Sequence, residues 1–450
     1  MSSKSRVQSR FAGMTLVGLV AAAGWFLSVE TRRMDLTVAS ETAVRRPTGE
    51  PQLVSVEPLP ALEGQICEWA PASAGTTLLG SLQQEGASRP PPASGSTAGT
   101  QTSREVERAP VRVIRDTFPT YSAVAVDPIR NEIVLQDENL FQIMVYDRMA
   151  NTPPSASMTE PKRVIGGNKT RMEFNCGLYI DPKSGDIYSV NNDTMDTLVI
   201  FSREAKGNVP PDRELYTPHG TYGIAVDEQK QELFLTVEHT NAVVVYRKLA
   251  QRDEQPLRIL QGEHTGLEDP HGIAVDTRSQ FLFVTNHGNA RNRERGGRFE
   301  PPSITVYPLG ASGDTAPVRV IQGARTRLNW PAQLSVDEEH QELFVANDAD
   351  DSVLVFRTTD SGDVAPARIL RGPQTGLKNP TGVFVDTANQ EIVVSNMGNH
   401  SATVYPRTAS GDVAPLRTIR NSPQGKLALA IGNPGAAGYD SKREEILVPN

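Results

Sequence analysis

Short apolar runs alternate with polar turns along the C-terminal three quarters of the chain, and residues 366–405 show the pattern most clearly. This stretch contains the runs Pro-Ala-Arg-Ile-Leu (366–370), Pro-Thr-Gly-Val-Phe-Val-Asp (380–386), Glu-Ile-Val-Val-Ser-Asn (391–396) and Ser-Ala-Thr-Val-Tyr (401–405). Val, Ile and Tyr favour strands, and the Gly, Asn, Asp and Pro residues between the runs favour turns. Four strands in about 50 residues predict one blade of a β-propeller.

This unit recurs seven times. An aspartate ends the second run of each unit, at intervals of 46 to 61 residues. The seven aspartates are Asp127, Asp181, Asp227, Asp276, Asp337, Asp386 and Asp440. Ten residues after the aspartate, six of the seven units carry Asn or Asp, and a Pro-x-Arg run also occurs seven times. The pattern therefore predicts an all-β chain folded as a seven-bladed β-propeller.

The order of the runs predicts how the ring closes. The Pro-x-Arg run that precedes each inner strand is expected to be the outermost strand of the preceding blade. The first such run, 111–115, has no preceding blade, so we expect it to join the last blade beside the strands that end at Asp440 and Asn450. Pairing the N- and C-terminal strands removes open sheet edges. A six-bladed ring with partly formed terminal units is the alternative, and the count of seven inner strands argues against it.

Residues 1–33 predict a signal anchor or a signal peptide. Lys4, Arg6 and Arg10 precede an uncharged run of 17 residues, 11–27, which is at the short limit for a membrane-spanning helix. Ala21–Ala23 offers a small-residue cleavage site, but the apolar Gly-Trp-Phe-Leu that follows favours an uncleaved anchor. We expect a protein of the bacterial cell envelope, anchored in the inner membrane with the propeller in the periplasm, or secreted if the signal is cleaved.

The composition of the rest of the chain predicts two further segments. Residues 34–105 are rich in Pro, Ser and Gly and predict a tether that is partly disordered, because such a sequence buries little apolar surface. Residues 106–450 hold the propeller, which we expect to be monomeric. The two cysteines, Cys67 and Cys176, could form a disulfide in an exported protein, and Cys176 could equally be a small buried residue. The net charge of −8 argues against nucleic acid as a partner.

Differences between the repeats indicate where a ligand would bind. Residues five positions before each repeat aspartate are expected to surround one mouth of the central channel, and His271 is the only histidine among them. Further polar and aromatic residues fall there or in the neighbouring strand-end turns. The ligand-binding candidates of the mouth are Asp137, Tyr222, Glu238, His239 and His271, with His287 nearby. Such a cluster could hold a cation or a polar ligand.

The interval between the fourth and fifth repeat aspartates contains an inserted loop, 288–302. It carries Arg291, Arg293, Arg295 and Arg298, and we consider it a candidate recognition loop because loops often carry function. A tolerated surface insertion explains it equally well. The sequence contains no Gly-x-Ser-x-Gly elbow, phosphate-binding loop or zinc-binding helix motif.

Several runs resemble a known family. Tyr-Gly-Ile-Ala-Val-Asp (222–227), His-Gly-Ile-Ala-Val-Asp (271–276) and Ser-Ile-Thr-Val-Tyr (303–307) resemble NHL repeats and the related lactonase-like and gluconolactonase-like bacterial β-propellers. That family includes binding and sensing propellers, lactone hydrolases and lyases. The hydrolases among them hold a divalent cation with Glu, Asn and Asp inside the channel. The resemblance implies Glu238, Asn191, Asn286 and Asn347 as metal-site candidates.

Two functions are therefore expected. The first is a membrane-tethered binding or scaffold module for a protein, peptide or glycan partner, with no cofactor. The alternative is a divalent-cation-dependent, lactonase-type hydrolase that acts in the channel mouth. The sequence favours the non-enzymatic function, since the repeated residues are those that build each blade. Ordered metal at the mouth would favour the hydrolase.

Overall fold

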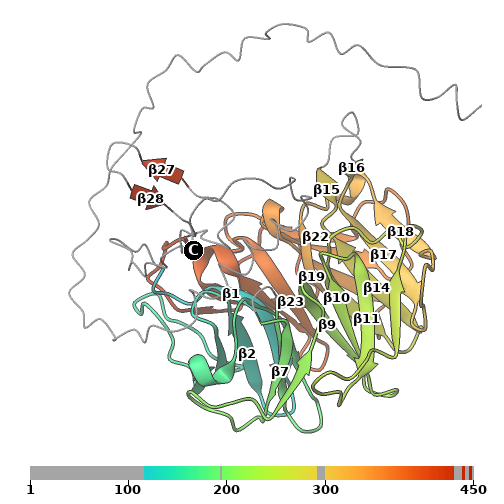
Figure 1. Cartoon of the computed structure of the whole chain (residues 1–450). Helices are drawn as coiled ribbons and strands as arrows, with labels where there is room; N and C mark the ends of the chain where they lie inside the picture. The colour runs from blue at the N-terminus through green and yellow to red at the C-terminus, as the bar shows by residue number, and fades with distance from the viewer. Residues whose placement is uncertain (1–115, 193–194, 291–298, 430–437, 441–444, 448–450) are drawn as a thin grey trace, which may run out of the picture. The chain divides into compact units, whose positions relative to one another are not determined.

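The computed structural model describes residues 116–192, 195–290, 299–429, 438–440 and 445–447 (Figure 1). The predicted N-terminal helix, the tether and the first Pro-x-Arg run lie outside these residues, as does Cys67. No helix within the described ranges combines the length and the apolar character that crossing a membrane requires.

Six four-stranded antiparallel sheets, called blades 1 to 6 here, make up the ring. Blade 1 contains β1 (Tyr121–Asp127), β2 (Glu132–Asp137), β3 (Gln142–Asp147) and β4 (Arg163–Gly166). Blade 2 contains β5 (Asn175–Ile180), β6 (Ile187–Asn191), β7 (Thr197–Phe201) and β8 (Arg213–Tyr216). Blade 3 contains β9 (Thr221–Asp227), β10 (Glu232–Val237), β11 (Ala242–Arg247) and β12 (Arg258–Gln261).

The second half of the ring repeats this order. Blade 4 contains β13 (Pro270–Asp276), β14 (Phe281–Asn286), β17 (Ser303–Pro308) and β18 (Arg319–Gln322), with the short hairpin β15 (Asn289–Ala290) and β16 (Phe299–Glu300) inserted. Blade 5 contains β19 (Pro331–Asp337), β20 (Glu342–Asn347), β21 (Ser352–Arg357) and β22 (Arg368–Arg371). Blade 6 contains β23 (Pro380–Asp386), β24 (Glu391–Asn396), β25 (Ser401–Pro406) and β26 (Arg417–Arg420). Single turns of 3-10 helix are η1 (Asn168–Thr170), η3 (Ala324–Thr326), η4 (Asp348–Asp350) and η5 (Met397–Asn399).

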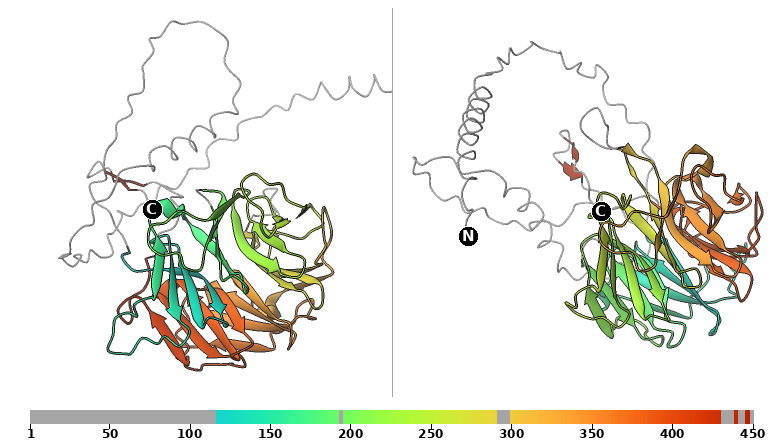
Figure 2. Two further views of the ribbon diagram at one scale, coloured as in Figure 1. Left: turned by 90° about the horizontal axis from the view of Figure 1, so that it is seen from below. Right: turned by 90° about the vertical axis from the view of Figure 1, so that its right-hand side faces the viewer.

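The all-β propeller is confirmed, but the described residues close as a ring of six blades and not seven. The inner strand β1 contacts β23 and β24, so blades 1 and 6 lie side by side (Figure 2). The loop between β3 and β4 reaches blade 6, where the amide of Thr152 donates to the carbonyl of Thr418 over 2.7 Å and Met158 forms a bridge with Asn421.

Of the seventh repeat, the described residues form β27 (Gly438–Asp440) and β28 (Glu445–Leu447), which pair as a two-stranded sheet. The ring closes without this repeat because β1 packs against β23 and β24 and the loop between β3 and β4 bonds to blade 6. Blade 1 takes its fourth strand, β4, from the second Pro-x-Arg run, as predicted. The first run, 111–115, lies outside the described residues, so its pairing with the C-terminal strands stays a prediction.

The Pro-x-Arg runs form the outermost strand of every blade, as the sequence predicted. In four blades the arginine that begins this strand pairs with the glutamate that begins the second strand of the same blade. The pairs are Arg163–Glu132, Arg258–Glu232, Arg368–Glu342 and Arg417–Glu391. A forked guanidinium binds a carboxylate through two parallel hydrogen bonds, so these pairs tie the second strand to the fourth.

Glycines let the inner strands approach one another closely. A Cβ atom on Gly223 would lie less than 3.0 Å from the carbonyl oxygen of His271, and one on Gly272 would lie equally close to that of Ala332. The same position in blade 5 carries Gln333, whose side chain reaches the carbonyl oxygen of Cys176 in blade 2 over 2.5 Å. Gln333 thereby links the inner strands of two blades that are not neighbours.

Candidate functional site

A repeated backbone hydrogen bond builds one mouth of the channel. In each blade, the amide of the residue after the second strand donates to the carbonyl of the residue that directly precedes the inner strand. The six donors, called the mouth ring here, are Glu138, Asn192, Glu238, His287, Asp348 and Met397. Since the same bond positions all six, blades 1, 3 and 5 each place a carboxylate at the same end of their strands.

The acceptors of these bonds also recur in geometry. Phe174, Asp269, Trp330 and Asn379 have φ values between 43° and 54°, in the left-handed region. Such a backbone costs a bulky side chain on the order of 1 kcal/mol, so Phe174 and Trp330 hold strained positions beside the mouth. Trp330 is 58% exposed despite its size.

His271 lies at the centre of the polar cluster. Its Nε2 donates to Oε1 of Glu238 over 2.9 Å, and its Nδ1 donates to the carbonyl oxygen of Asp269 over 3.0 Å. Burial alone lowers the pKa of this imidazole, but the bond to Glu238, with a smaller contribution from Asp269, outweighs burial and raises it. With both nitrogens donating, His271 is an imidazolium paired with a carboxylate.

Four aromatic rings, including that of His271, pack against one another here. The rings of His271 and His287 have centroids 3.3 Å apart at 20°, and His287 stacks on Trp330 at 5.4 Å and 5°. Tyr222 packs on the other side of His271 at 4.4 Å. Burial, and next the positive charge of His271, hold the pKa of His287 well below its ordinary value. His287 is therefore neutral, and its Nε2 is buried without a hydrogen-bond partner.

Asp269, His271 and His287 form the one group of three metal-ligating side chains within the described ranges, with ligand atoms within 4.8 Å of one another. These N and O donors suit Zn²⁺. The lone pairs of an imidazole lie in the ring plane, however, so two rings stacked almost in parallel do not converge on one ion. A cation would need a rotation of one ring and the release of a proton from His271.

The carboxyl groups of this end of the channel hold their protons unusually well. Burial raises the pKa of Asp137 to about 7. Burial, followed by the charges of Asp137 and Asp348, raises the pKa of Glu138 to about 7 as well. Burial likewise raises the pKa values of Asp269 and Asp348. Asp137 and Glu138 therefore gain or lose a charge close to neutral pH.

The structure brings only some of the predicted residues together. Glu238, His271 and Tyr222 meet in the cluster, whereas His239 packs on His219 at 4.8 Å. Asp137 is fully buried and accepts the amide of Thr120. The arginines of the inserted loop, Arg291, Arg293, Arg295 and Arg298, lie outside the described residues.

The three asparagines named as metal candidates face their own blades. The Oδ1 atoms of Asn191, Asn286 and Asn347 accept the amides of Glu173, Glu268 and Asn329. Each asparagine thus fixes the loop that enters the inner strand. In each blade the mouth-ring residue comes one position after the place of this asparagine. In blade 3 the mouth-ring residue is Glu238, and it is the metal candidate that reaches the cluster.

Sequence reasoning missed Asp269 and Trp330, although a signal for them exists. Both stand seven positions before a repeat aspartate, where the other blades have Thr120, Phe174, Gly220 and Asn379. The position varies because its side chain does not build the blade. What Asp269 and Trp330 share is a left-handed backbone, and both side chains are substantially exposed.

Comparison with known proteins supports the fold assignment. Residues 178–369 match a family model described as Lactonase, 7-bladed beta-propeller. The match begins in β5 and ends in β22, and it contains Glu238, Asp269, His271, His287 and Trp330. The resemblance to lactonase-like propellers is therefore confirmed, and the matched residues make up most of blades 2 to 5. The described residues form six blades where the family description has seven.

Solved structures also match. A chain from the crystal structure of a nidogen/laminin complex is 15% identical with a TM-score of 0.43, covering 68% of this chain and 94% of that one. A functionally unknown protein from Desulfotomaculum acetoxidans DSM 771 is 13% identical with a TM-score of 0.45, covering 68% and 88%. No curated protein matches this chain.

Proposed function

We propose that this lactonase-like β-propeller is a binding module whose channel mouth takes a glycan or another hydroxyl-rich small ligand. One observation carries the proposal. Trp330 is 58% exposed, yet its indole is stacked on His287. His287 lies beside the carboxyl group of Asp269 and stacks on His271, the partner of Glu238. A large apolar ring is thus held rigidly next to polar groups that have hydrogen-bonding capacity to spare.

The chemistry of this arrangement fits a sugar ring. The face of an indole covers the apolar C–H face of a sugar, while carboxylates accept hydrogen bonds from the hydroxyls at its edge. Asp269, whose side chain is 43% exposed, is the carboxyl group most accessible to a ligand. Because the stack already orders Trp330, binding loses little side-chain entropy.

Calorimetric titration of the full chain with a panel of monosaccharides, disaccharides and sugar lactones tests this proposal. We expect one saturable site, which Trp330→Ala weakens at least tenfold, since loss of a stacked aromatic anchor costs about 2 kcal/mol. Leu416→Ala is the matched control, because Leu416 is 53% exposed beside outer strand β26 and should leave affinity unchanged. Binding that Trp330→Ala leaves intact, or no binding of any sugar or lactone, would overturn the proposal.

A second function, a divalent-cation-dependent hydrolase of the lactonase type, is favoured by the family match. The matched segment contains the whole stacked cluster. Here Asp269, His271 and His287 would hold the cation, and Glu238 would orient His271 through its Nε2 proton, as second-sphere carboxylates do. A bound cation would polarise a lactone carbonyl and activate water.

Lactone hydrolysis measured with and without a chelator tests the second function. We expect activity that is restored by one divalent metal and lost in His287→Ala. Activity that the chelator does not affect excludes the cation, and the absence of turnover for all lactones in the panel leaves the binding module as the function.

We further propose that residues 1–33 tether the propeller to the inner membrane of a bacterial cell envelope. The support is the basic flank followed by 17 uncharged residues. Fractionation of cells that express the full chain tests it, because a cleaved signal would release the propeller from the membrane fraction.

A further inference from the structure

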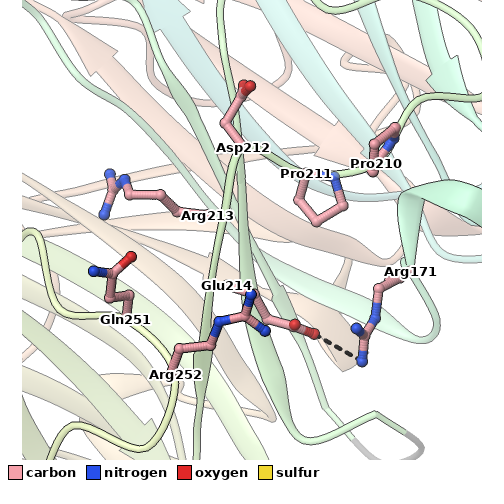
Figure 3. A pocket seen from close by; sticks show the side chains of 8 residues that line it. All are labelled: Arg171, Pro210, Pro211, Asp212, Arg213, Glu214, Gln251 and Arg252. Atoms are coloured by element: carbon pink, nitrogen blue, oxygen red, sulfur yellow. Dashed lines mark ion pairs between the residues drawn. The ribbon is translucent and has the colours of Figure 1, made fainter.

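A cavity of about 180 Å³ lies between blades 2 and 3 on the outer strands. Its charged lining residues are Arg171, Asp212, Arg213, Glu214 and Arg252, joined by Pro210, Pro211 and Gln251 (Figure 3). None of these residues belongs to the mouth ring or to its stacked cluster. The cavity is large enough for a phosphate-sized ion together with some of its water.

Arg252 occupies a backbone position that is glycine at four other blade boundaries. The amide of Arg252 donates to Glu214 and its carbonyl accepts from Tyr216, which joins the turn to the outer strand of the preceding blade. The residues that make the same pair of bonds elsewhere are Gly207, Gly313, Gly362 and Gly411, all with φ between 62° and 77°. Arg252 has a φ of 58°, a strained value for a residue with a Cβ.

Arg213 differs from its equivalents in a complementary way. It begins the outer strand of blade 2, where the corresponding arginines of four other blades pair with a glutamate of the same blade. In blade 2 that position holds Asp186, and no ion pair joins it to Arg213 within the described ranges. Arg213 instead donates to the neutral hydroxyl of Tyr188, and its Nη1 is buried without a partner.

The acidic side chains of the cavity already have partners within the protein. Glu214 pairs with Arg171 at 3.0 Å, and Asp212 accepts the amide of Ser202. No acid of the described residues pairs with the guanidinium of Arg252. Two guanidinium groups without an acid partner therefore line one cavity. Arg252 is exposed, but Nη1 of Arg213 is buried, and a buried charged donor without a partner is costly unless a counter-ion binds it.

We propose that this cavity binds a small oxyanion of the phosphate type, held by Arg213 and Arg252. Guanidinium groups bind such ions through paired, charge-assisted hydrogen bonds, which explains why arginine replaces glycine at a left-handed position. The side chain of Gln251 adds an uncharged donor on the same loop. Neither the fold nor the mouth requires the strain at Arg252.

Calorimetric titration of the full chain with inorganic phosphate, in a phosphate-free buffer of low ionic strength, tests this proposal. Arg252→Gly is the informative variant, because glycine is the residue found at the equivalent boundaries and relieves the strain. We expect it to fold with unchanged or raised thermal stability and to bind phosphate about 10- to 100-fold more weakly, as loss of a charge-assisted hydrogen bond predicts. Arg213→Gln should weaken binding to a similar extent.

Arg247→Gln is the charge-matched control. Arg247 lies five residues before Arg252, is itself exposed, pairs with Glu254 and does not line the cavity, so its loss should leave phosphate affinity within about twofold. No saturable binding by the unaltered chain at millimolar phosphate would overturn the proposal. Equal affinities for the unaltered chain and Arg252→Gly would overturn it as well.

Discussion

The guanidinium of Arg148 donates from Nη1 to Oε2 of Glu391 over 2.7 Å, although 243 residues separate the two in the sequence. Arg148 follows the third strand of blade 1, and Glu391 begins the second strand of blade 6. Basic residues after the third strand also join blades 3 and 6 to the blade before them, through Lys248–Asp181 and Arg407–Glu342. Blades 1 and 6 are therefore connected as other neighbouring blades are.

Removing this pair should weaken the closure of the ring. Both side chains are 12% exposed, but Glu391 keeps a second partner in Arg417. We therefore expect Arg148→Ala to lower the free energy of unfolding by about 1–2 kcal/mol, less than a fully buried charge left alone would cost. Chemical denaturation measures the change. Arg203→Ala, which breaks an exposed pair with Glu204, should cost less than about 0.5 kcal/mol, and equal losses would contradict the closing role.

The raised pKa of Asp137 predicts that its contribution to the stability of the folded protein falls as pH rises. Burial raises the pKa of its carboxyl group from 3.8 to about 7, so between these values the folded state holds a proton that the unfolded state releases. Stability due to this group therefore decreases from about pH 4 to pH 7 and stays low above it. Asp137→Asn keeps an oxygen for the amide of Thr120 and removes the charge.

We expect Asp137→Asn to raise the free energy of unfolding by on the order of 1–3 kcal/mol at pH 8, and by much less at pH 5. Denaturation at both pH values measures the difference. Asn191→Asp, the reverse change at the equivalent position of blade 2, should destabilise the chain at pH 8. A gain for Asp137→Asn that does not depend on pH would show that the carboxyl group is not the cause.

Position 223 should not accept even the methyl side chain of alanine. A Cβ atom there would lie less than 3.0 Å from the carbonyl oxygen of His271, and β9 and β13 cannot separate without opening the ring. We expect Gly223→Ala to cost more than about 2 kcal/mol and to disturb the His271 ring. Thermal unfolding measures the loss. Gly310→Ala adds the same atom into open space at a backbone that any residue adopts, so a similar loss in that variant would refute the packing argument.

The sequence predicted the blade well because each blade repeats its own physical requirements. The inner-strand aspartates accept turn amides, as Asp127 does from Ile129 and Arg130, and the Pro-x-Arg arginines pair within their sheets. The number of blades was wrong because counting inner strands ignores the fourth strand. Within the described residues the seventh repeat pairs only β27 with β28, and the loop that joins blade 1 to blade 6 carries no repeat motif.

The site was predictable only in part, for a related reason. His271 and Glu238 stood out because they interrupt repeated positions. Trp330 and Asp269 occupy a position that every blade fills differently, so no interruption marks them. The stacking that brings His287 between His271 and Trp330 depends on the twist of two neighbouring blades, which no local pattern records.

The pair formed by His271 and Glu238 makes the protonation of the mouth measurable. Burial would lower the pKa of His271, and the carboxylate of Glu238 reverses that effect, so Glu238→Gln should lower the pKa. His271 contributes stability below its unfolded pKa of 6.5 and loses it as pH rises through the folded value. The destabilisation by Glu238→Gln should consequently be larger at pH 6 than at pH 9.

NMR titration of the imidazole C–H signals, assigned with His271→Gln, measures this pKa directly. Asp196→Asn is the control, because it removes the partner of the exposed His219 and leaves the pair intact. A pKa of His271 that Glu238→Gln does not change would contradict the ion pair.

The same titration bears on the cation, because Zn²⁺ competes with the ring proton and would bind His271 only as that proton leaves. If the mouth holds a cation, Glu238→Gln should also weaken its binding by about 10- to 100-fold, since the carboxylate would then orient a ligand.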